Sequence, residues 1–125
     1  WDKGKCRHYN KRGRATTCSV FAYPQGASGF GTLNQSGNVW EWCQDWYDSE
    51  YYSNSPDRNP EGPTTGGLRV VRGGSMINPR PSAAFRTAEL PGKGYISGYH
   101  HGDLGFRPCL PLNQSNGPRE NDNSH

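Results

Sequence analysis

Apolar residues gather in short runs along this chain rather than in long periodic stretches. The richest run is residues 39–47, where three tryptophans at i, i+2 and i+6 match neither a helix nor a strand cleanly. Residues 68–72 have strand composition and end at two glycines, which predicts a strand there. Short strands are also predicted at 20–23 and 104–110, whereas residues 83–88 fit either a turn of helix or a strand.

The segments between these runs consist of turn and loop residues. Residues 24–37 hold one proline and four glycines, and residues 48–67 and 91–103 read as long loops. Loops longer than about 12–15 residues in a compact domain need a function or an added support. A bound metal ion is one candidate for that support.

Composition agrees with a loop-rich globular piece. The chain has 125 residues, of which 30% are hydrophobic and 12% aromatic, with 17 Gly and 10 Pro. This length allows one domain, and the aromatic content argues against a disordered chain. Residues 113–125 carry no apolar side chain, so we expect a disordered polar tail there.

Charge and hydropathy exclude two function classes. The mean hydropathy is −1.02 and no run of about 20 apolar residues occurs, so we expect no membrane span. The net charge is +3 and the basic residues are scattered, which argues against a nucleic-acid partner. Neither feature decides between a cytoplasmic and an exported protein, and both locations stay open.

Four short motifs occur in a fixed order: GNVWEW at 37–42, RVVRGGS at 69–75, RTA at 86–88 and LGFR at 104–107. NPEGP at 59–63 and WDKGKC at 1–6 add to them. Together they resemble the formylglycine-generating enzyme, or sulfatase-modifying factor, family over residues 1–112. The resemblance implies an α+β fold with little regular secondary structure, an elaborated C-type-lectin-like fold.

Family domains are longer than this chain, which begins at Trp1 and has its one methionine at Met76. We therefore expect residues 1–112 to be the C-terminal portion of an incomplete domain.

The resemblance also implies a structural calcium site at the GNVWEW turn. Matched by position, its ligands would be the backbone carbonyls of Asn34, Gly37 and Val39 and the side chain of Glu41. Calcium takes oxygen ligands of these kinds. The alternative is that Glu41 simply pairs with an arginine, either Arg72 or Arg107. For Arg107 itself we expect a partner among buried carbonyls or Glu41.

The family's catalytic pattern is missing. Formylglycine-generating enzymes use two cysteines that bind Cu(I), and the matching positions fall near Asn78 and Ala83. No cysteine lies in residues 76–85, so we expect no copper and assign no catalytic residue. Thiolates are the ligands that Cu(I) prefers.

Four cysteines lie elsewhere, and their spacing matches no zinc motif. We expect Cys43 and Cys109 to be small buried residues, while a disulfide between Cys6 and Cys18 stays open. We expect the three tryptophans of residues 39–47 to pack in the core, since the chain is poor in aliphatic residues.

Three functions follow from these observations. The first is a non-catalytic binding module that displays loop 76–103 to an unknown protein or small-molecule ligand, as the resemblance to variable proteins of diversity-generating systems implies. Its predicted contacts are Asn78, Arg80, Tyr95, Tyr99 and His100. The second is part of an oxidoreductase, such as a hercynine oxygenase, whose iron ligands lie upstream. The third, a true formylglycine generator, is disfavoured by the missing cysteine pair.

Overall fold

We analysed a computed structural model, which describes residues 2, 4–9, 16–91 and 102–109. Regular structure is sparse, as the composition predicts. No helix in these residues is long and apolar enough to cross a membrane. The elements in chain order are η1 (Pro24–Gly26), β1 (Trp40–Trp46), α1 (Tyr51–Asn54), β2 (Arg69–Arg72), β3 (Arg86–Glu89) and β4 (Leu104–Phe106).

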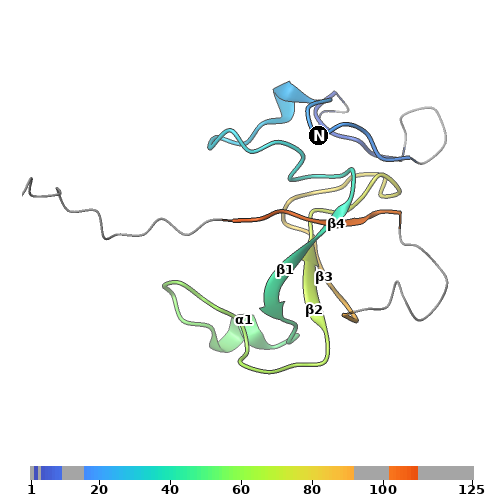
Figure 1. The fold of residues 1–125 in the computed structure, drawn as a ribbon. Coiled ribbons are helices and arrows are strands. Elements are labelled where there is room, and N and C mark those ends of the chain that lie inside the picture. Colours follow the sequence, from blue (N-terminus) through green and yellow to red (C-terminus); the bar gives the residue numbers. More distant parts are fainter. Residues whose placement is uncertain (1, 3, 10–15, 92–101, 110–125) are drawn as a thin grey trace, which may run out of the picture.

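The four strands form one mixed sheet in the order β3-β2-β1-β4. β1 pairs antiparallel with β2, and β2 pairs antiparallel with β3. β4 pairs parallel with β1 and places Gly105 beside Glu41. Figure 1 shows the N-terminal segment above the start of β1, and α1 with its loop at the other end of that strand.

A register shift in β1 explains why its tryptophans fit no single period. Trp42 pairs with Val71, and Trp46 pairs with Arg69. β1 therefore advances by four residues while β2 advances by two, which is the signature of a bulged strand. A strand with a shift of this kind changes its in-and-out alternation part-way along.

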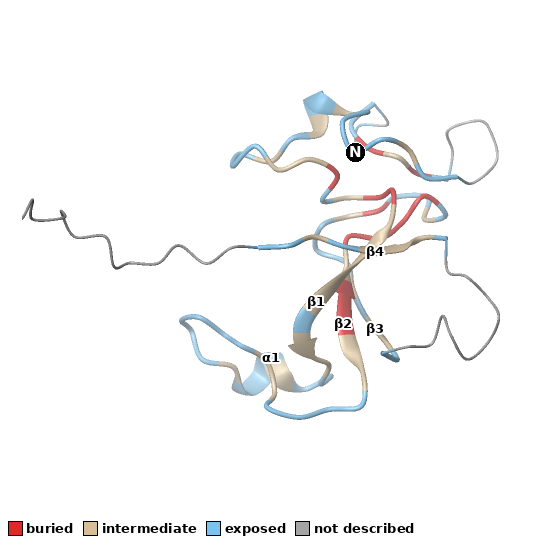
Figure 2. Ribbon diagram, viewed as in Figure 1, coloured by how far each residue is buried: buried red, intermediate tan, exposed pale blue. Residues whose placement is uncertain are grey.

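Burial is concentrated where the loops meet the start of β1 and the end of β2, rather than over a whole face of the sheet (Figure 2). The buried apolar residues of the described chain are Cys6, Val70, Val71 and Met76. Four polar residues are buried among them: His8, Asn34, Asn38 and Ser75. The core is thus small and rich in hydrogen-bonding groups.

The expectation of a tryptophan core is wrong for the described chain. Trp40, Trp42 and Trp46 are all only half-buried. Trp40 stacks on Phe85 with ring centroids 6.5 Å apart, and the Arg69 guanidinium lies 3.5 Å from the centre of the Trp46 ring. Within the described residues, η1 and α1 are the only helices, and both are too short to cover a sheet face. The rings therefore remain partly in contact with solvent.

Two cysteine expectations also fail, because Cys43 is half-buried and Cys109 is exposed. Cys43 lies on β1, whose residues are all half-buried or exposed. Cys109 lies three residues beyond the end of β4. Cys6 is the buried cysteine instead.

Local structure differs from the predictions at several segments. Residues 20–23 form a turn rather than a strand, because Ala22 N donates to Ser19 O at 3.0 Å and Phe21 N donates to Ser19 Oγ at 3.3 Å. Residues 48–67 include the single turn α1. The ambiguous segment 83–88 leads into strand β3, and the predicted strand 104–110 ends at Phe106.

Gly37 begins a tight turn just before β1, and several chain segments meet at this turn. Its φ is +80°, a conformation that glycine adopts readily. A Cβ at this position would lie 2.1 Å from Arg7 O, so no side chain fits without moving the backbone. Gly37 N donates to Gly73 O at 3.0 Å, which ties the turn to the end of β2.

Asn38, the next residue of the turn, makes hydrogen bonds with both its backbone and its side chain. Its backbone N donates to Arg7 O at 3.0 Å, and its O accepts from Met76 N at 2.9 Å. Its amide Oδ1 accepts from Cys18 N at 2.9 Å, while Nδ2 donates to Cys18 O at 3.3 Å. The side chain therefore pairs with Cys18 as a neighbouring strand would. Its φ of +65° is one that asparagine tolerates.

We predict that Asn38→Ala destabilises the fold by about 2–4 kcal/mol, because it removes two hydrogen bonds between the amide side chain and the Cys18 backbone. Urea unfolding followed by tryptophan fluorescence measures the change. The control is Asn54→Ala at the exposed end of α1, which should shift stability by less than about 0.5 kcal/mol. Equal losses in the two variants would show that Asn38 has no special role.

Candidate functional site

The Glu41 carboxylate and the Arg107 guanidinium form a two-pronged ion pair. Arg107 Nη2 donates to Glu41 Oε1 at 2.6 Å, and Nε donates to Oε2 at 3.0 Å. The parallel pairing of β4 with β1 sets this geometry, since Gly105 lies beside Glu41 and Arg107 follows two residues later. Of the two arginines that the sequence offered to Glu41, the structure selects Arg107. Arg72 instead donates to Tyr52 OH at 2.6 Å.

Arg107 also binds the chain segment that precedes the Gly37–Asn38 turn. Its Nη2 donates to Leu33 O at 2.7 Å, which confirms the expectation of a carbonyl partner together with Glu41. The hydrogen bond to Glu41 raises the pKa of Arg107 above its ordinary value, so the guanidinium stays charged at any physiological pH. One side chain thereby links β1, β4 and the chain near Leu33.

Asn34 places an amide oxygen against the same region. Its Nδ2 donates to Val20 O at 2.5 Å, whereas its Oδ1 is buried and has no hydrogen-bond partner within the described residues. Asn34, Val39 and Glu41 all line one cavity of about 500 Å³. Phe106, which is 77% exposed, borders that cavity. Three of the four predicted calcium residues therefore line the same cavity, while Gly37 is buried in the adjoining turn.

The donors at this cavity suit a hard cation. A buried amide oxygen and a carboxylate are ligand types that calcium takes. A carboxylate has about four lone-pair sites, so Glu41 keeps acceptor capacity beyond its two bonds to Arg107. In the part of the chain that the structure describes, no group of three or more His, Cys, Asp or Glu side chains is placed to hold a metal ion. Backbone carbonyls would have to complete the ligand set.

Ser75 joins the two ends of the predicted loop 76–103, which is not a loop throughout, because strand β3 (Arg86–Glu89) lies within it. This fully buried serine donates from Oγ to Asp103 Oδ2 at 2.8 Å. The Asp103 carbonyl in turn accepts from Trp40 N at 2.7 Å. Both ends of the loop are therefore fixed to each other and to the start of β1.

Asn78 lies near one of the positions predicted to match the family's cysteines, and its side chain makes a hydrogen bond. Asn78 Oδ1 accepts from Ser75 N at 2.7 Å. Ala83, near the other matching position, is exposed, and its N donates to Ser36 Oγ at 2.9 Å. Arg80 is exposed. The remaining predicted contacts lie outside the described residues: Tyr95, Tyr99 and His100.

All four cysteines are thiols in the structure, and Cys6 and Cys18 are not joined by a disulfide. The pKa of the Cys43 thiol is raised, first by its burial and then by the nearby Asp45 carboxylate. Cys43 is therefore protonated at neutral pH, where a thiol is a poor nucleophile.

Comparison with known protein families shows to which family this chain belongs. The family model for the sulfatase-modifying factor enzyme 1-like domain matches residues 2–110. The chain belongs to this family. The resemblance inferred from GNVWEW, RGGS and GFR is thus confirmed.

Among curated relatives, the formylglycine-generating enzyme of Streptomyces coelicolor is 38% identical over 112 residues. That alignment covers 84% of this chain and 33% of the relative, so the chain spans about a third of the length of that enzyme. The serine/threonine-protein kinase pkn1 of Chlamydia pneumoniae is 44% identical over 62 residues, which is 48% of this chain and 10% of the kinase.

Two solved structures share the fold. Treponema denticola variable protein 1 superimposes with a TM-score of 0.63 at 29% identity, covering 83% of this chain and 35% of that protein. PvdO from Pseudomonas aeruginosa gives a TM-score of 0.62 at 22% identity, covering 82% of this chain and 38% of PvdO. The small mixed sheet with few helices is consistent with the fold of this family, and the predicted fold class is confirmed.

The motif analysis assigned roles to Gly37, Val39 and Glu41 but missed Asn38 between them. The signal available was an asparagine directly after a glycine, a pair that favours successive positive φ angles. The Ser75–Asp103 contact was also missed, because 28 residues separate its partners in the sequence.

Proposed function

We propose that this chain is a non-catalytic binding module of its family that displays loop 76–103. The observation that carries the proposal is Asn78. Near a position where the family resemblance implies a copper-binding cysteine, this chain has an amide whose oxygen accepts a hydrogen bond from Ser75 N. An amide held in this way offers no soft ligand for Cu(I).

The frame of the loop supports display. Ser75 and Asp103 close the loop at its base, and Asn38 fixes the neighbouring Met76 N. A loop closed on a fixed frame can vary in sequence while the frame keeps its structure. The likeness to Treponema denticola variable protein 1 agrees with this function. Tyr95 and Tyr99 would be the aromatic anchors of the contact surface.

We further propose a structural calcium ion at the cavity beside Glu41. Its ligands would be the backbone carbonyls of Asn34, Gly37 and Val39, the Glu41 carboxylate and the orphaned Asn34 Oδ1. The ion would supply the positive charge that satisfies this buried amide oxygen. Since Arg107 already balances the charge of Glu41, the site suits a structural ion more than a strongly binding sensor.

In a turnover assay with a Cys-x-Pro-x-Arg peptide, oxygen and Cu(I), we expect no formylglycine, because no thiolate pair can hold the metal. Mass spectrometry of the peptide measures the product. The matched variant is Asn78→Cys/Ala83→Cys, which should gain Cu(I) binding because it restores the pair. Product formed by the unaltered chain would contradict a non-catalytic role and favour the alternative, an oxidoreductase part.

Replacing Arg80, Tyr95, Tyr99 and His100 together by serine should leave the free energy of unfolding within about 1 kcal/mol, since display residues lie outside the frame. Ser75→Ala should cost about 1–3 kcal/mol, because it removes the donor to Asp103. Urea unfolding measures both values. A large loss in the loop variant would identify its side chains as core residues and argue against display.

Calcium at 100 times its dissociation constant should stabilise the fold by about 2.7 kcal/mol, seen as a higher melting temperature that EDTA reverses. Glu41→Gln also disturbs the Arg107 pair, so the quantity to compare is the calcium-dependent increment in each variant. We expect the increment to vanish in Glu41→Gln. Magnesium at equal ionic strength is the control, and an increment that is equal in both proteins would contradict the site.

A further inference from the structure

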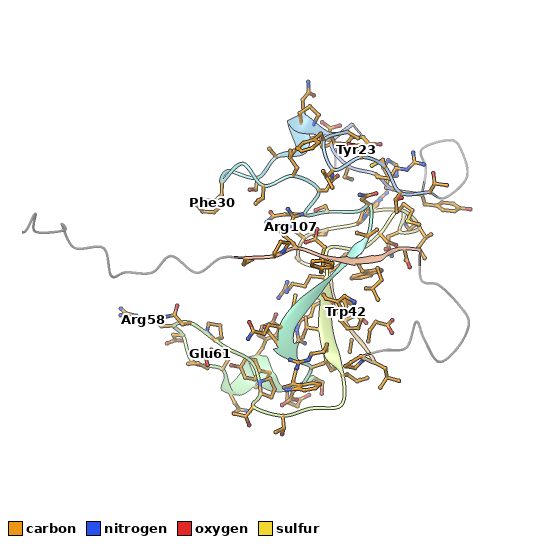
Figure 3. The ribbon with its side chains drawn as sticks, in the orientation of Figure 1. Tyr23, Phe30, Trp42, Arg58, Glu61 and Arg107 are labelled. Atoms are coloured by element: carbon orange, nitrogen blue, oxygen red, sulfur yellow. The ribbon has the colours of Figure 1, made fainter. Side chains whose placement is uncertain are left out.

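A second cavity of about 500 Å³ lies at the far end of β1 from the Glu41–Arg107 pair. Its walls are Trp46 at the end of β1 and two prolines of the loop after α1, Pro60 and Pro63. Figure 3 shows Glu61, which also lines it, beside α1 and well away from Arg107. The volume falls in the range of small-ligand pockets, about 300–1,000 Å³.

The loop that forms one wall is fixed against β1. Gly62 has a φ of +82°, and a Cβ there would lie 2.9 Å from Asp45 Cβ. Its backbone N donates to Tyr51 OH at 3.0 Å. Gly66 approaches Trp46 equally closely, with 2.9 Å from its ideal Cβ position to Trp46 Cβ. The shape of this cavity is thus set by close backbone packing.

Arg69, which also lines the cavity, contacts Trp46 and Gln44. Its guanidinium lies 3.5 Å from the centre of the Trp46 ring, and its Nη1 donates to Gln44 O. Because the guanidinium covers one face of Trp46 and Gly66 packs on the same side chain, the ring offers no open platform for stacking a sugar or a base.

Two carboxylates face the cavity without a partner. Asp45 is half-buried and Glu61 is exposed, and neither makes a hydrogen bond or an ion pair within the residues that the structure describes. Arg69 is the one cationic side chain among the lining residues. The lining residues therefore carry a net negative charge, and Pro60 and Pro63 supply apolar surface beside it.

We propose that this cavity binds an ammonium group on an alkyl stem, the chemistry of a lysine side chain in a partner protein. The ammonium has three N–H donors, which the carboxylates of Asp45 and Glu61 can accept. The methylene stem would contact Pro60 and Pro63, as such stems do on apolar surfaces. The site uses residues 44–69, so it is separate from loop 76–103 and independent of the displayed surface.

The test is a titration of the ¹⁵N-labelled chain with Nα-acetyl-lysine amide, followed by NMR. We expect saturable shifts at the amides of Asp45, Trp46 and Glu61 and at the Trp46 indole N–H. Nα-acetyl-norleucine amide, which has a similar stem without the charge, should give none. Glu61→Gln should weaken binding by up to about five-fold, because it removes the charge of an exposed carboxylate from the ion pair. Asp57→Asn removes a neighbouring exposed carboxylate outside the cavity and should leave binding unchanged.

Three outcomes would overturn the proposal. The first is the absence of saturable shifts with the lysine probe while the spectrum remains dispersed. The second is equal weakening in Glu61→Gln and Asp57→Asn, which would indicate general charge attraction. The third is a response of the same amides to calcium or to a neutral sugar in place of the lysine probe. Unchanged spectral dispersion in both variants shows that the fold is retained.

Discussion

The Gly37–Asn38 turn is the constraint on which the rest of this structure depends. Two successive residues with positive φ bring the chain within reach of Arg7, Cys18 and Met76, and hydrogen bonds from Asn38 join all three. A fold with few buried apolar side chains gains little from the hydrophobic effect. Hydrogen bonds between segments far apart in the sequence instead specify how these segments pack together.

The cavity beside Glu41 and the base of loop 76–103 both adjoin this turn. One residue further, the chain enters the cavity lined by Val39 and Glu41, where the parallel partner β4 delivers Arg107. On the other side, the Met76 N that Asn38 holds directly follows Ser75, the closing residue of loop 76–103. The proposed ion site and the proposed display loop therefore share one support, so damage to the turn would affect both together.

Local composition was sufficient to predict β2, and the motifs were sufficient to predict the family and its fold. The strand at 39–47 was ambiguous because a register shift breaks its alternation, and such a shift depends on pairing with β2. Residues 20–23 look like a strand, but Ser19 offers competing local hydrogen bonds. The role of Asn38 and the Ser75–Asp103 contact depend on which distant segments meet, and no local pattern encodes that.

The closure of loop 76–103 by a buried serine and an aspartate has a consequence for loop length. Its two anchors are 28 residues apart and bond directly to each other. For a loop closed at its base, the entropic cost of added residues grows only logarithmically, by about 0.6 kcal/mol for each doubling of length. Strand β3 lies between the anchors and pairs with β2, so this low cost applies to residues inserted or deleted after β3, and homologues can differ in length there.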